Sequence, residues 1–299
     1  MELILSILAG VGLFLYGMNL MSDGLQKVAG QKMRDVLEKL TKSSIMGLLL
    51  GIIFTGIIQS SNATTVLVVS FVNSGIMKLS QSVGVIMGAN IGTTVTGQLI
   101  SFKLDAIAPF FIIAGVILVM FIKKPMAKRI GEVVLGFGIL FFGMSTLSSS
   151  VKHLNQFAAV KTLFGSVTNP FLAVLIGFVL TSILQSASAS VGILIVLASS
   201  GLIHPDICYY IIMGCDIGAC GSAVLSSLGG NKDAKRAALI HLSFNMIGTV
   251  IVMILLAVAG NPIRSAIHGL TVSIADTGLR AGRDVANINS ILKVSQVII

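Results

Sequence analysis

Long uninterrupted apolar runs restrict what this chain can fold into. A membrane-spanning helix needs about 20 mainly apolar residues, whereas a strand of a membrane barrel alternates over about 10. These runs do not alternate and contain no Asp, Glu, Lys or Arg, so they predict an all-α integral membrane protein. They are Leu3–Met21, Ala106–Ile122, Val133–Leu147 and Ala237–Ala259.

The composition excludes two other classes of protein. Hydrophobic residues make up 55% of the 299 residues and charged residues only 10%, whereas soluble domains carry about 25% charged residues. The chain is therefore neither an ordinary soluble enzyme nor an intrinsically disordered protein. Its net charge of +9 comes largely from basic clusters at 27–42, 123–129 and 232–236, as is typical of loops on the cytoplasmic side of a membrane. We expect the lipid bilayer as a partner and no nucleic acid.

The sequence also repeats itself with a fixed offset, the one that takes Gly10 to Gly136. The same offset aligns Gln59-Ser60 with Gln185-Ser186 without a gap. Because such a register indicates internal duplication, we predict repeat 1 at 1–126 and repeat 2 at 127–259. The remaining residues, 260–299, are predicted to form an extracytoplasmic loop and a partial terminal helix that is too short to span the membrane.

Each repeat contains an apolar stretch with hydroxyl residues at its middle, at 46–74 and at 170–200. Each half of such a stretch is about 13 residues, or about 20 Å of helix, which is too short for a hydrocarbon core of about 30 Å. We therefore predict two re-entrant helical hairpins, each entering and leaving the membrane on one side. A span broken by glycines follows each hairpin, at 80–100 and at 206–228.

With the hairpins counted as re-entrant, each repeat has three transmembrane helices. An odd number of crossings inverts the second copy relative to the first, as in many secondary transporters. The basic clusters then fall on one side of the membrane, which predicts that side to be cytoplasmic and the N-terminus to lie outside. The expected location is a bacterial plasma (inner) membrane.

Four polar clusters interrupt the apolar segments at repeat-related positions. Irregular backbone at membrane depth occurs where it is buried in protein or lines a cavity, so we predict a binding site where the clusters meet. The structural alternative is that small and hydroxyl residues only allow close helix packing. The clusters are Gln59–Thr65, Gln185–Ser190, Gly88–Thr94 and Gly214–Cys220.

The side chains of these clusters indicate which ions would bind. Hydroxyl groups and the N-termini of half-helices favour an anion. Every Lys or Arg assigned to a side falls at the end of a segment, so an anion here would need a co-bound cation, and neutral oxygen ligands suit Na⁺. Asp216, which aligns with Asn90, could ligate Na⁺, accept a proton or serve only as a hydrogen-bonded structural group. No His or Cys cluster has the spacing of a transition-metal site.

The doubled motifs resemble those of the sodium/phosphate cotransporter family, type II, which has bacterial members. The resemblance rests on the two Gln-Ser hairpins and on the Gly88–Thr94 and Gly214–Cys220 segments, and also on Lys232–Ala238 and His241–Asn245. It implies a symporter that imports inorganic phosphate by alternating access, with Na⁺ as coupling ion and no organic cofactor. Ala187, Asp216, Ala219 and Cys220 depart from the family pattern in repeat 2.

The resemblance also implies roles for individual residues and partners. A second copy of the chain, forming a homodimer, is a further expected partner. A PhoU-like regulatory protein is another, because longer bacterial relatives carry a PhoU-like domain. The residues expected to bind phosphate are Gln59, Ser60, Ser61, Asn62, Gln185, Ser186 and Ser188. Those expected to bind Na⁺ are Thr64, Thr65, Asn90, Thr93, Thr94, Ser190 and Asp216.

Three alternatives remain open at this stage. The substrate could be another small oxyanion or a dicarboxylate, or the protein could be a passive anion channel. A membrane enzyme would use Ser60 or Ser186 as nucleophile, but neither has a base and an acid partner in its motif. We therefore expect no enzymatic activity.

Overall fold

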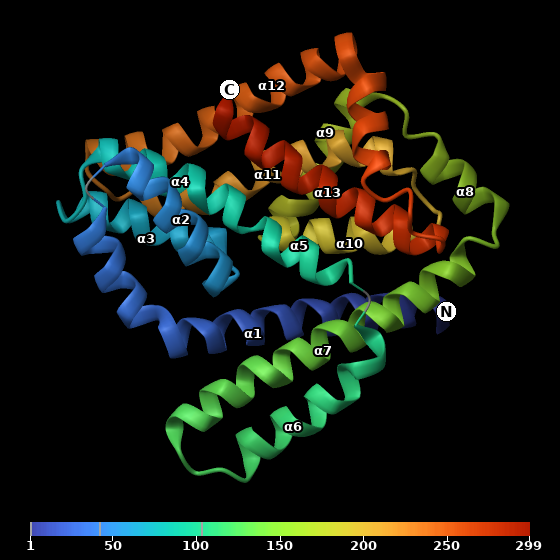
Figure 1. Ribbon diagram of the computed structural model, residues 1–299, viewed down its shortest axis with the longest axis horizontal. Coiled ribbons are helices and arrows are strands. Elements are labelled where there is room, and N and C mark those ends of the chain that lie inside the picture. The colour runs from blue at the N-terminus through green and yellow to red at the C-terminus, as the bar shows by residue number, and fades with distance from the viewer. Residues whose placement is uncertain (1, 42, 103) are drawn as a thin grey trace.

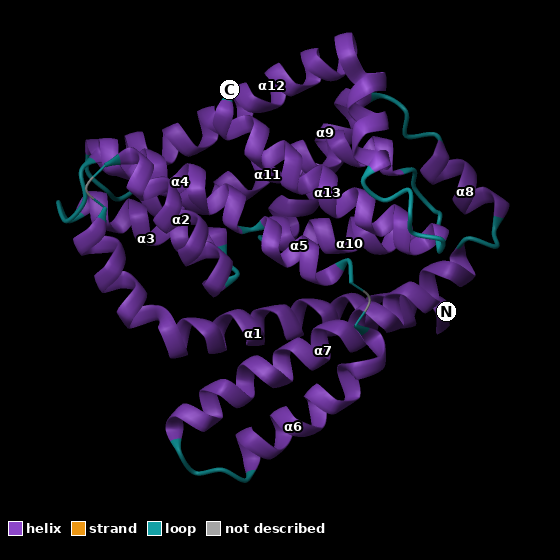
Figure 2. Ribbon diagram, viewed as in Figure 1, coloured by secondary structure: helices purple, strands orange, loops and turns teal. Residues whose placement is uncertain are grey.

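The computed structural model describes the backbone of residues 2–41, 43–102 and 104–299, and their side chains except those of 31–33 and 38–40. Lys42, part of the first basic cluster, lies outside the described residues. The described chain folds into helices joined by short loops and contains no strand (Figure 2). The all-α prediction is confirmed.

Five helical segments among the described residues are long and apolar enough to cross a membrane. The segment 2–30 of α1 is one of them, and α8 with α9, bent by 105° at their junction, would make a sixth if the pair is one span. The five belong to α1 (Glu2–Leu40), α4 with α5 (Leu79–Gly92 and Thr94–Ile100), α7 (Pro125–Leu154), α11 (Pro205–Ser227) and α12 (Lys232–Gly269).

The remaining elements are shorter or more polar. The predicted span 106–122 is a 3₁₀ turn, η1 (Asp105–Ile107), followed by the 13-residue helix α6 (Ala108–Met120), which is shorter than a full span. The others are α2 (Ser44–Ile58), α3 (Ser61–Asn73), α8 (Ala158–Gly165), α9 (Pro170–Leu184), α10 (Ala187–Ser199) and α13 (Thr277–Ile298).

Helices α1 and α7 lie side by side along the molecule (Figure 1). They approach so closely that a Cβ atom on Gly17 would lie 2.3 Å from the Leu140 nitrogen, and one on Gly143 2.4 Å from the Phe14 nitrogen. Residue numbers rise along α1 as they fall along α7, so the two helices are antiparallel. The close approaches pair Gly10 with Leu147, Phe14 with Gly143, Gly17 with Leu140, and Met21 with Gly136.

Each hairpin packs its first half-helix against the span that follows the hairpin, α2 against α4 and α9 against α11. A Cβ on Gly88 of α4 would lie 2.1 Å from the Leu48 oxygen, and one on Gly214 of α11 1.9 Å from the Val174 oxygen. Both members of each pair differ by the repeat offset. The same local packing therefore occurs in both repeats.

The two hairpins turn at equivalent residues. Gln59 ends α2 with φ = 61° and Gln185 ends α9 with φ = 54°, and these are the non-glycine residues with positive φ in the described chain. Such a left-handed conformation is uncommon for residues other than glycine. The next residues, Ser60 and Ser186, cap α3 and α10, and each hydroxyl accepts a hydrogen bond from a backbone N–H three residues on.

Two segments differ from the sequence-based predictions. Helix α11 runs without a break through Gly214–Cys220. At the equivalent place in repeat 1, α4 ends at Gly92, and the Thr93 hydroxyl donates to the Asn90 carbonyl at 2.6 Å. Repeat 2 has Ala219 at this position, which has no hydroxyl to bond with the helix backbone. The glycines of Gly214–Cys220 by themselves do not interrupt α11.

The C-terminal segment is more ordered than a loop with a partial helix. Helix α12 kinks at Ala259 and continues to Gly269, past Pro262. Helix α13 then begins after Asp276, whose side chain accepts a hydrogen bond from the Leu279 N–H, and extends over 22 residues. The polar residues that suggested a loop are helical, and several of them are buried against α10 and α11.

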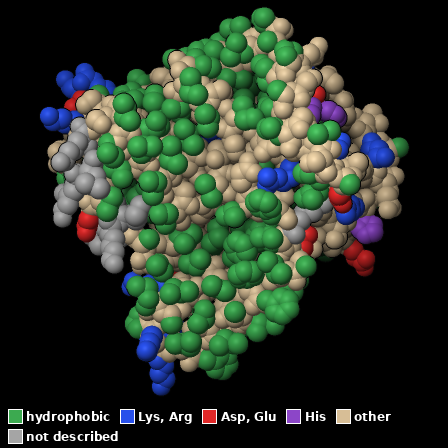
Figure 3. All heavy atoms as spheres, in the orientation of Figure 1, with side chains coloured by type: hydrophobic (Ala, Val, Ile, Leu, Met, Phe, Trp, Pro, Cys, Tyr) green, Lys and Arg blue, Asp and Glu red, His purple; other side chains and the backbone are tan. Residues whose placement is uncertain are grey.

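The outer surface is largely apolar. Figure 3 shows hydrophobic side chains over most of the face drawn, with charged side chains mainly toward its left, lower and right margins. Large hydrophobic residues such as Leu8, Ile113 and Ile254 are about 60% exposed. An apolar surface of this extent is suited to lipid rather than water, so the chain is a multi-pass membrane protein.

Candidate functional site

The tips of the two hairpins line one small cavity of about 70 Å³. The Asn62 side chain joins the tips directly, since its Nδ2 donates to the Gln185 carbonyl oxygen at 2.7 Å. All seven residues predicted to bind phosphate line this tip cavity: Gln59, Ser60, Ser61, Asn62, Gln185, Ser186 and Ser188. The structure thus brings together two segments that are far apart in the sequence.

The tip cavity has the electrostatic character of a small anion site. Two helices, α3 and α10, begin at its wall, and the first N–H groups of a helix have no partner within the helix. Helix N-termini also carry a partial positive charge. No charged side chain lines the cavity among the described residues. Because pockets for drug-sized molecules are about 300–1,000 Å³, the cavity suits a small ion better.

The glutamine of each tip fixes the hairpin turn. The Gln185 Nε2 donates to the Ser182 carbonyl at 2.5 Å, and the Gln59 Nε2 donates to the Gly56 carbonyl in the same way. Gln59 is also tied to α5, because its Oε1 accepts a hydrogen bond from the Thr96 hydroxyl at 2.6 Å. The tip of repeat 1 is therefore held against the segment that follows the break in its span.

The residues predicted to bind Na⁺ do not share one cavity. Thr64 and Ser190 lie behind the two tips, where their hydroxyls pair with Thr55 at 2.8 Å and with Thr181 at 2.7 Å. The Thr65 hydroxyl donates to the Ser61 carbonyl. The remaining residues lie on the spans after the hairpins: Asn90, Thr93 and Thr94 at the junction of α4 and α5, and Asp216 within α11.

One prediction about this region is wrong. We expected no Lys or Arg near the polar clusters, but the Lys293 ammonium donates to Asp216 Oδ1, and both side chains are fully buried. Lys293 lies in the terminal segment that we predicted to be a partial helix. Because α13 is a 22-residue helix packed against α11, it carries this cation into the interior.

Sequence analysis also missed several polar residues around the site. Asn19 and Ser22 of α1 line the tip cavity, and the Ser22 hydroxyl donates to the Ile58 carbonyl of α2 at 2.9 Å. Asn245 of α12 bridges the two repeats, with its Oδ1 3.4 Å from Asn90 Nδ2 and its own Nδ2 3.2 Å from the Cys220 sulfur. Asn19 and Asn245 were visible as amides inside apolar runs, a signal that could have identified them.

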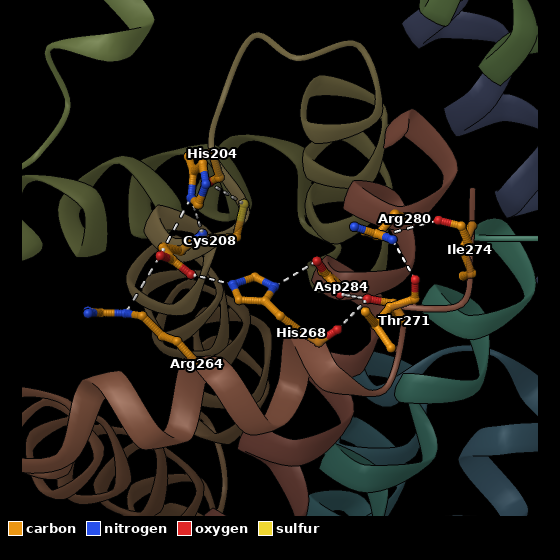
Figure 4. A network of polar contacts seen from close by, with 10 residues as sticks. His204, Cys208, Arg264, His268, Thr271, Ile274, Arg280 and Asp284 are labelled. Atoms are coloured by element: carbon orange, nitrogen blue, oxygen red, sulfur yellow. Dashed lines mark hydrogen bonds and ion pairs between the residues drawn. The ribbon is translucent and has the colours of Figure 1, made fainter. Parts of the chain in front are cut away.

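A second polar cluster holds the start of α13 in place (Figure 4). The His268 Nδ1 lies 2.7 Å from Asp284 Oδ2, and its Nε2 lies 3.0 Å from Asp206 Oδ1. The Thr271 hydroxyl donates to Asp284 Oδ1 at 2.5 Å. The cluster joins α11, α12 and α13 beside an open cavity of about 940 Å³.

Comparison with known protein families identifies relatives over most of the chain. A model of the Na⁺/Pi-cotransporter family matches twice, at residues 13–149 and again at 142–274. The family model thus matches each half of the chain, with bounds that differ from those of the predicted repeats at 1–126 and 127–259.

Three relatives from different organisms are similar to this chain over different lengths. "Uncharacterized protein YqeW" of Bacillus subtilis is 34% identical over 262 residues, which cover 87% of this chain and 84% of that protein. "Putative inorganic phosphate export protein YjbB" of Escherichia coli K12 is 30% identical over 251 residues, or 84% of this chain and 46% of that protein. Mouse "Sodium-dependent phosphate transport protein 2A" is 33% identical over 96 residues, 31% of this chain and 15% of that protein.

The chain thus spans about half the length of the E. coli relative. No solved structure matches it.

Proposed function

The chain belongs to the Na⁺/Pi-cotransporter family, and we propose that it is a secondary transporter that imports inorganic phosphate together with Na⁺ by alternating access. The observation that carries this proposal is the tip cavity, where residues from both repeats and the N-termini of α3 and α10 converge. Hydroxyl donors and helix N-termini can bind a phosphate oxyanion without a fixed cation at the cavity wall.

Coupling to Na⁺ follows from charge balance in the membrane. A phosphate ion carried through hydrocarbon needs its charge offset, and the cavity wall itself supplies no cationic side chain among the described residues. The hydroxyl and carbonyl groups behind the tips, such as those of Thr64 and Thr65, are neutral oxygen ligands of the kind that Na⁺ accepts. The mouse relative's name, a sodium-dependent phosphate transport protein, supports this part of the proposal.

Alternating access is supported by the contacts between the repeats. Gly17 contacts Leu140, and Phe14 contacts Gly143. Under the repeat offset Gly17 corresponds to Gly143 and Phe14 to Leu140, so the two contacts are equivalent by symmetry. A twofold relation between antiparallel helices gives two copies of opposite orientation, the arrangement in which transporters switch access around a central site.

A second cavity offers a path for an anion to the site. It measures about 250 Å³ and lies between α1, α2 and α3, with Lys27 and Arg34 in its lining. Gln26 of this cavity donates to the Ser22 hydroxyl at 3.3 Å, and Ser22 lines the tip cavity. Lys27 is paired with Glu132 at 2.8 Å, whereas the exposed Arg34 is a positive side chain that can raise the local concentration of an anion.

The direction of transport is the finer part of the proposal. We assign import because an inward Na⁺ gradient drives a coupled anion inward, whatever side the site opens to first. The export named for the E. coli relative is the alternative. It requires a phosphate gradient directed outward or a weaker Na⁺ coupling.

The experiment is uptake of labelled phosphate by the purified chain in proteoliposomes. Import coupled to Na⁺ predicts accumulation above equilibrium with an inward Na⁺ gradient and none with K⁺ in its place. Flux that is independent of Na⁺ would contradict the coupling. Conductance steps in a planar bilayer would instead establish a channel, and competition by arsenate, sulfate or a dicarboxylate would measure the preference for phosphate.

Location and partners complete the proposal. We assign the chain to the bacterial plasma membrane, with the N-terminus outside and the basic clusters at 123–129 and 232–236 in the cytoplasm. A homodimer and a PhoU-like regulatory protein remain predicted partners, to be tested by the mass of the purified complex and by co-purification.

A further inference from the structure

The Asp216–Lys293 ion pair is buried to an unusual degree. Asp216 is 1% exposed and Lys293 is 2% exposed, whereas the side chains of the Lys27–Glu132 pair are 51% and 26% exposed. Removing either charge from such a pair leaves the other without compensation in a medium of low polarity, which is strongly destabilising. A carboxylate in this position therefore requires a cation beside it.

The two repeats differ at this position in a consistent way. Repeat 1 has Asn90 and Thr93, which supply neutral oxygens, and its Asn90 amide contacts Asn245 at 3.4 Å. Repeat 2 has Asp216 at the place of Asn90 and Ala219 at the place of Thr93. It has thus lost a hydroxyl oxygen and gained a negative charge, and that charge already holds an ammonium group.

Lys293 belongs to neither repeat, and it reaches a space between them. Thr93 and Gly97 of repeat 1 and Ser188 of repeat 2 surround that space with Lys293. Ser188 also lines the tip cavity. Ser188 therefore borders both the space beside Lys293 and the proposed phosphate site.

Polar contacts on two sides hold α13 and so fix the position of Lys293. Gln98 of α5 donates to Ser290 at 3.0 Å, and Arg283 of α13 donates to the Ser101 hydroxyl at 2.8 Å. At the other side, Asp284 is bound by His268 and Thr271 (Figure 4). These contacts fix α13 and therefore fix the place where the Lys293 side chain enters the interior.

Two further oxygens at this place have no hydrogen-bond partner. Asp216 Oδ2 and Asn289 Oδ1 are both buried without one in the described structure, and Asn289 lines the same space as Lys293. Without the ammonium, Asp216 Oδ1 and Oδ2 would both be without a partner, and carboxylate oxygens are hard ligands of the kind that Na⁺ accepts. With the ammonium present, the charge of the carboxylate is already balanced.

We propose that the Lys293 ammonium is a built-in cation that takes, in repeat 2, the place of a coupling Na⁺. This inference rests on the proposed Na⁺-coupled transport and concerns its stoichiometry. Phosphate then moves with one Na⁺ fewer than it would if both repeats held Na⁺ at the position of Asn90 and Asp216.

The test measures the ratio of labelled Na⁺ to labelled phosphate taken up by proteoliposomes that contain the purified full chain, at a clamped membrane potential. Lys293→Met leaves the Asp216 carboxylate without its cation, so we expect Na⁺ to bind there and the ratio to rise by one Na⁺ per phosphate. Lys293→Arg keeps the charge and should keep the wild-type ratio. Lys161→Met, at an exposed lysine of α8, is the matched control for loss of a lysine.

A second variant covers the case in which Lys293→Met does not fold. Asp216→Leu/Lys293→Met removes both charges and also the oxygen ligands of Asp216, so no uncompensated charge remains buried, and we expect the wild-type ratio because this place held no Na⁺. A ratio lower by one Na⁺ would overturn the inference, as would an unchanged ratio in an active Lys293→Met protein. Wild-type uptake that ignores Na⁺ would instead contradict the proposed function itself.

Discussion

At the scale of single residues, the site depends on two glutamines held in a conformation that glutamine seldom adopts. Positive φ at Gln59 and Gln185 costs about 1–2 kcal/mol relative to a right-handed conformation. Strained backbone that persists at equivalent places of two repeats points to a functional constraint. The turn places a serine cap immediately after each glutamine, so that α3 and α10 begin at the cavity wall.

Replacement of Gln59 by alanine removes the side-chain amide but keeps the Cβ, and therefore keeps the strain of the positive φ. The variant thus measures the contribution of the amide alone. We expect Gln59→Ala to lower phosphate uptake by about tenfold or more, since Thr96 loses its buried acceptor, a loss of about 1–3 kcal/mol. The protein should still insert into the membrane. Gln156→Ala, at an exposed glutamine, is the control, and equal uptake by both variants would count against the site.

At the scale of elements, each half-helix hairpin is fixed by backbone contact with the span that follows. Glycine at 88 and at 214 lets a carbonyl of the neighbouring helix approach to where a Cβ would stand. Close packing of this kind takes the place of the hydrophobic effect, which does not drive helix association inside a membrane.

Alanine at one of these glycines should therefore destabilise the fold. A Cβ at Gly214 would lie 1.9 Å from the Val174 oxygen, so we expect Gly214→Ala to cost about 1–3 kcal/mol or more and to lower the melting temperature in detergent. Gly221→Ala is the matched control in the same helix, because nothing lies within 4 Å of its Cβ position. That variant should be unchanged or stabilised by up to about 1 kcal/mol.

Some of the helices and site residues could be predicted from the sequence, and others could not. Long apolar runs sufficed to predict an all-α membrane protein, and the residue pattern around Gln59 and Gln185 selected the tip-cavity residues of the two hairpins but not Asn19 and Ser22 of α1. Two further features were not predicted. Helix α11 is continuous where repeat 2 lacks the Thr93 hydroxyl of repeat 1, which is a local difference in sequence. The position of Lys293 depends on how α13 packs against α11, and such a tertiary contact cannot be read from a local pattern.

In the molecule as a whole, the proposed transport by alternating access requires two repeats of opposite orientation. The basic cluster at 123–129 then lies in the cytoplasm, and helix α8, which carries Lys161, lies outside. Both segments are exposed, so their sidedness can be measured directly.

Single cysteines at Lys124 and Lys161 test this orientation. The native Cys208, Cys215 and Cys220 are buried, so they should give little background with a membrane-impermeant thiol reagent. We expect Lys161→Cys to be labelled in intact cells and Lys124→Cys only after the membrane is opened. Labelling of both from the same side would contradict the inverted arrangement.

The two hairpin tips are proposed to meet and form the phosphate site, and cross-linking of Ser60→Cys/Ser186→Cys measures whether they do. Because both residues line one cavity, we expect a short bifunctional thiol reagent to join them within one chain. Phosphate should slow the reaction, and the joined protein should no longer transport. If both cysteines react singly but are never joined, or if phosphate has no effect on their joining, the claim is contradicted.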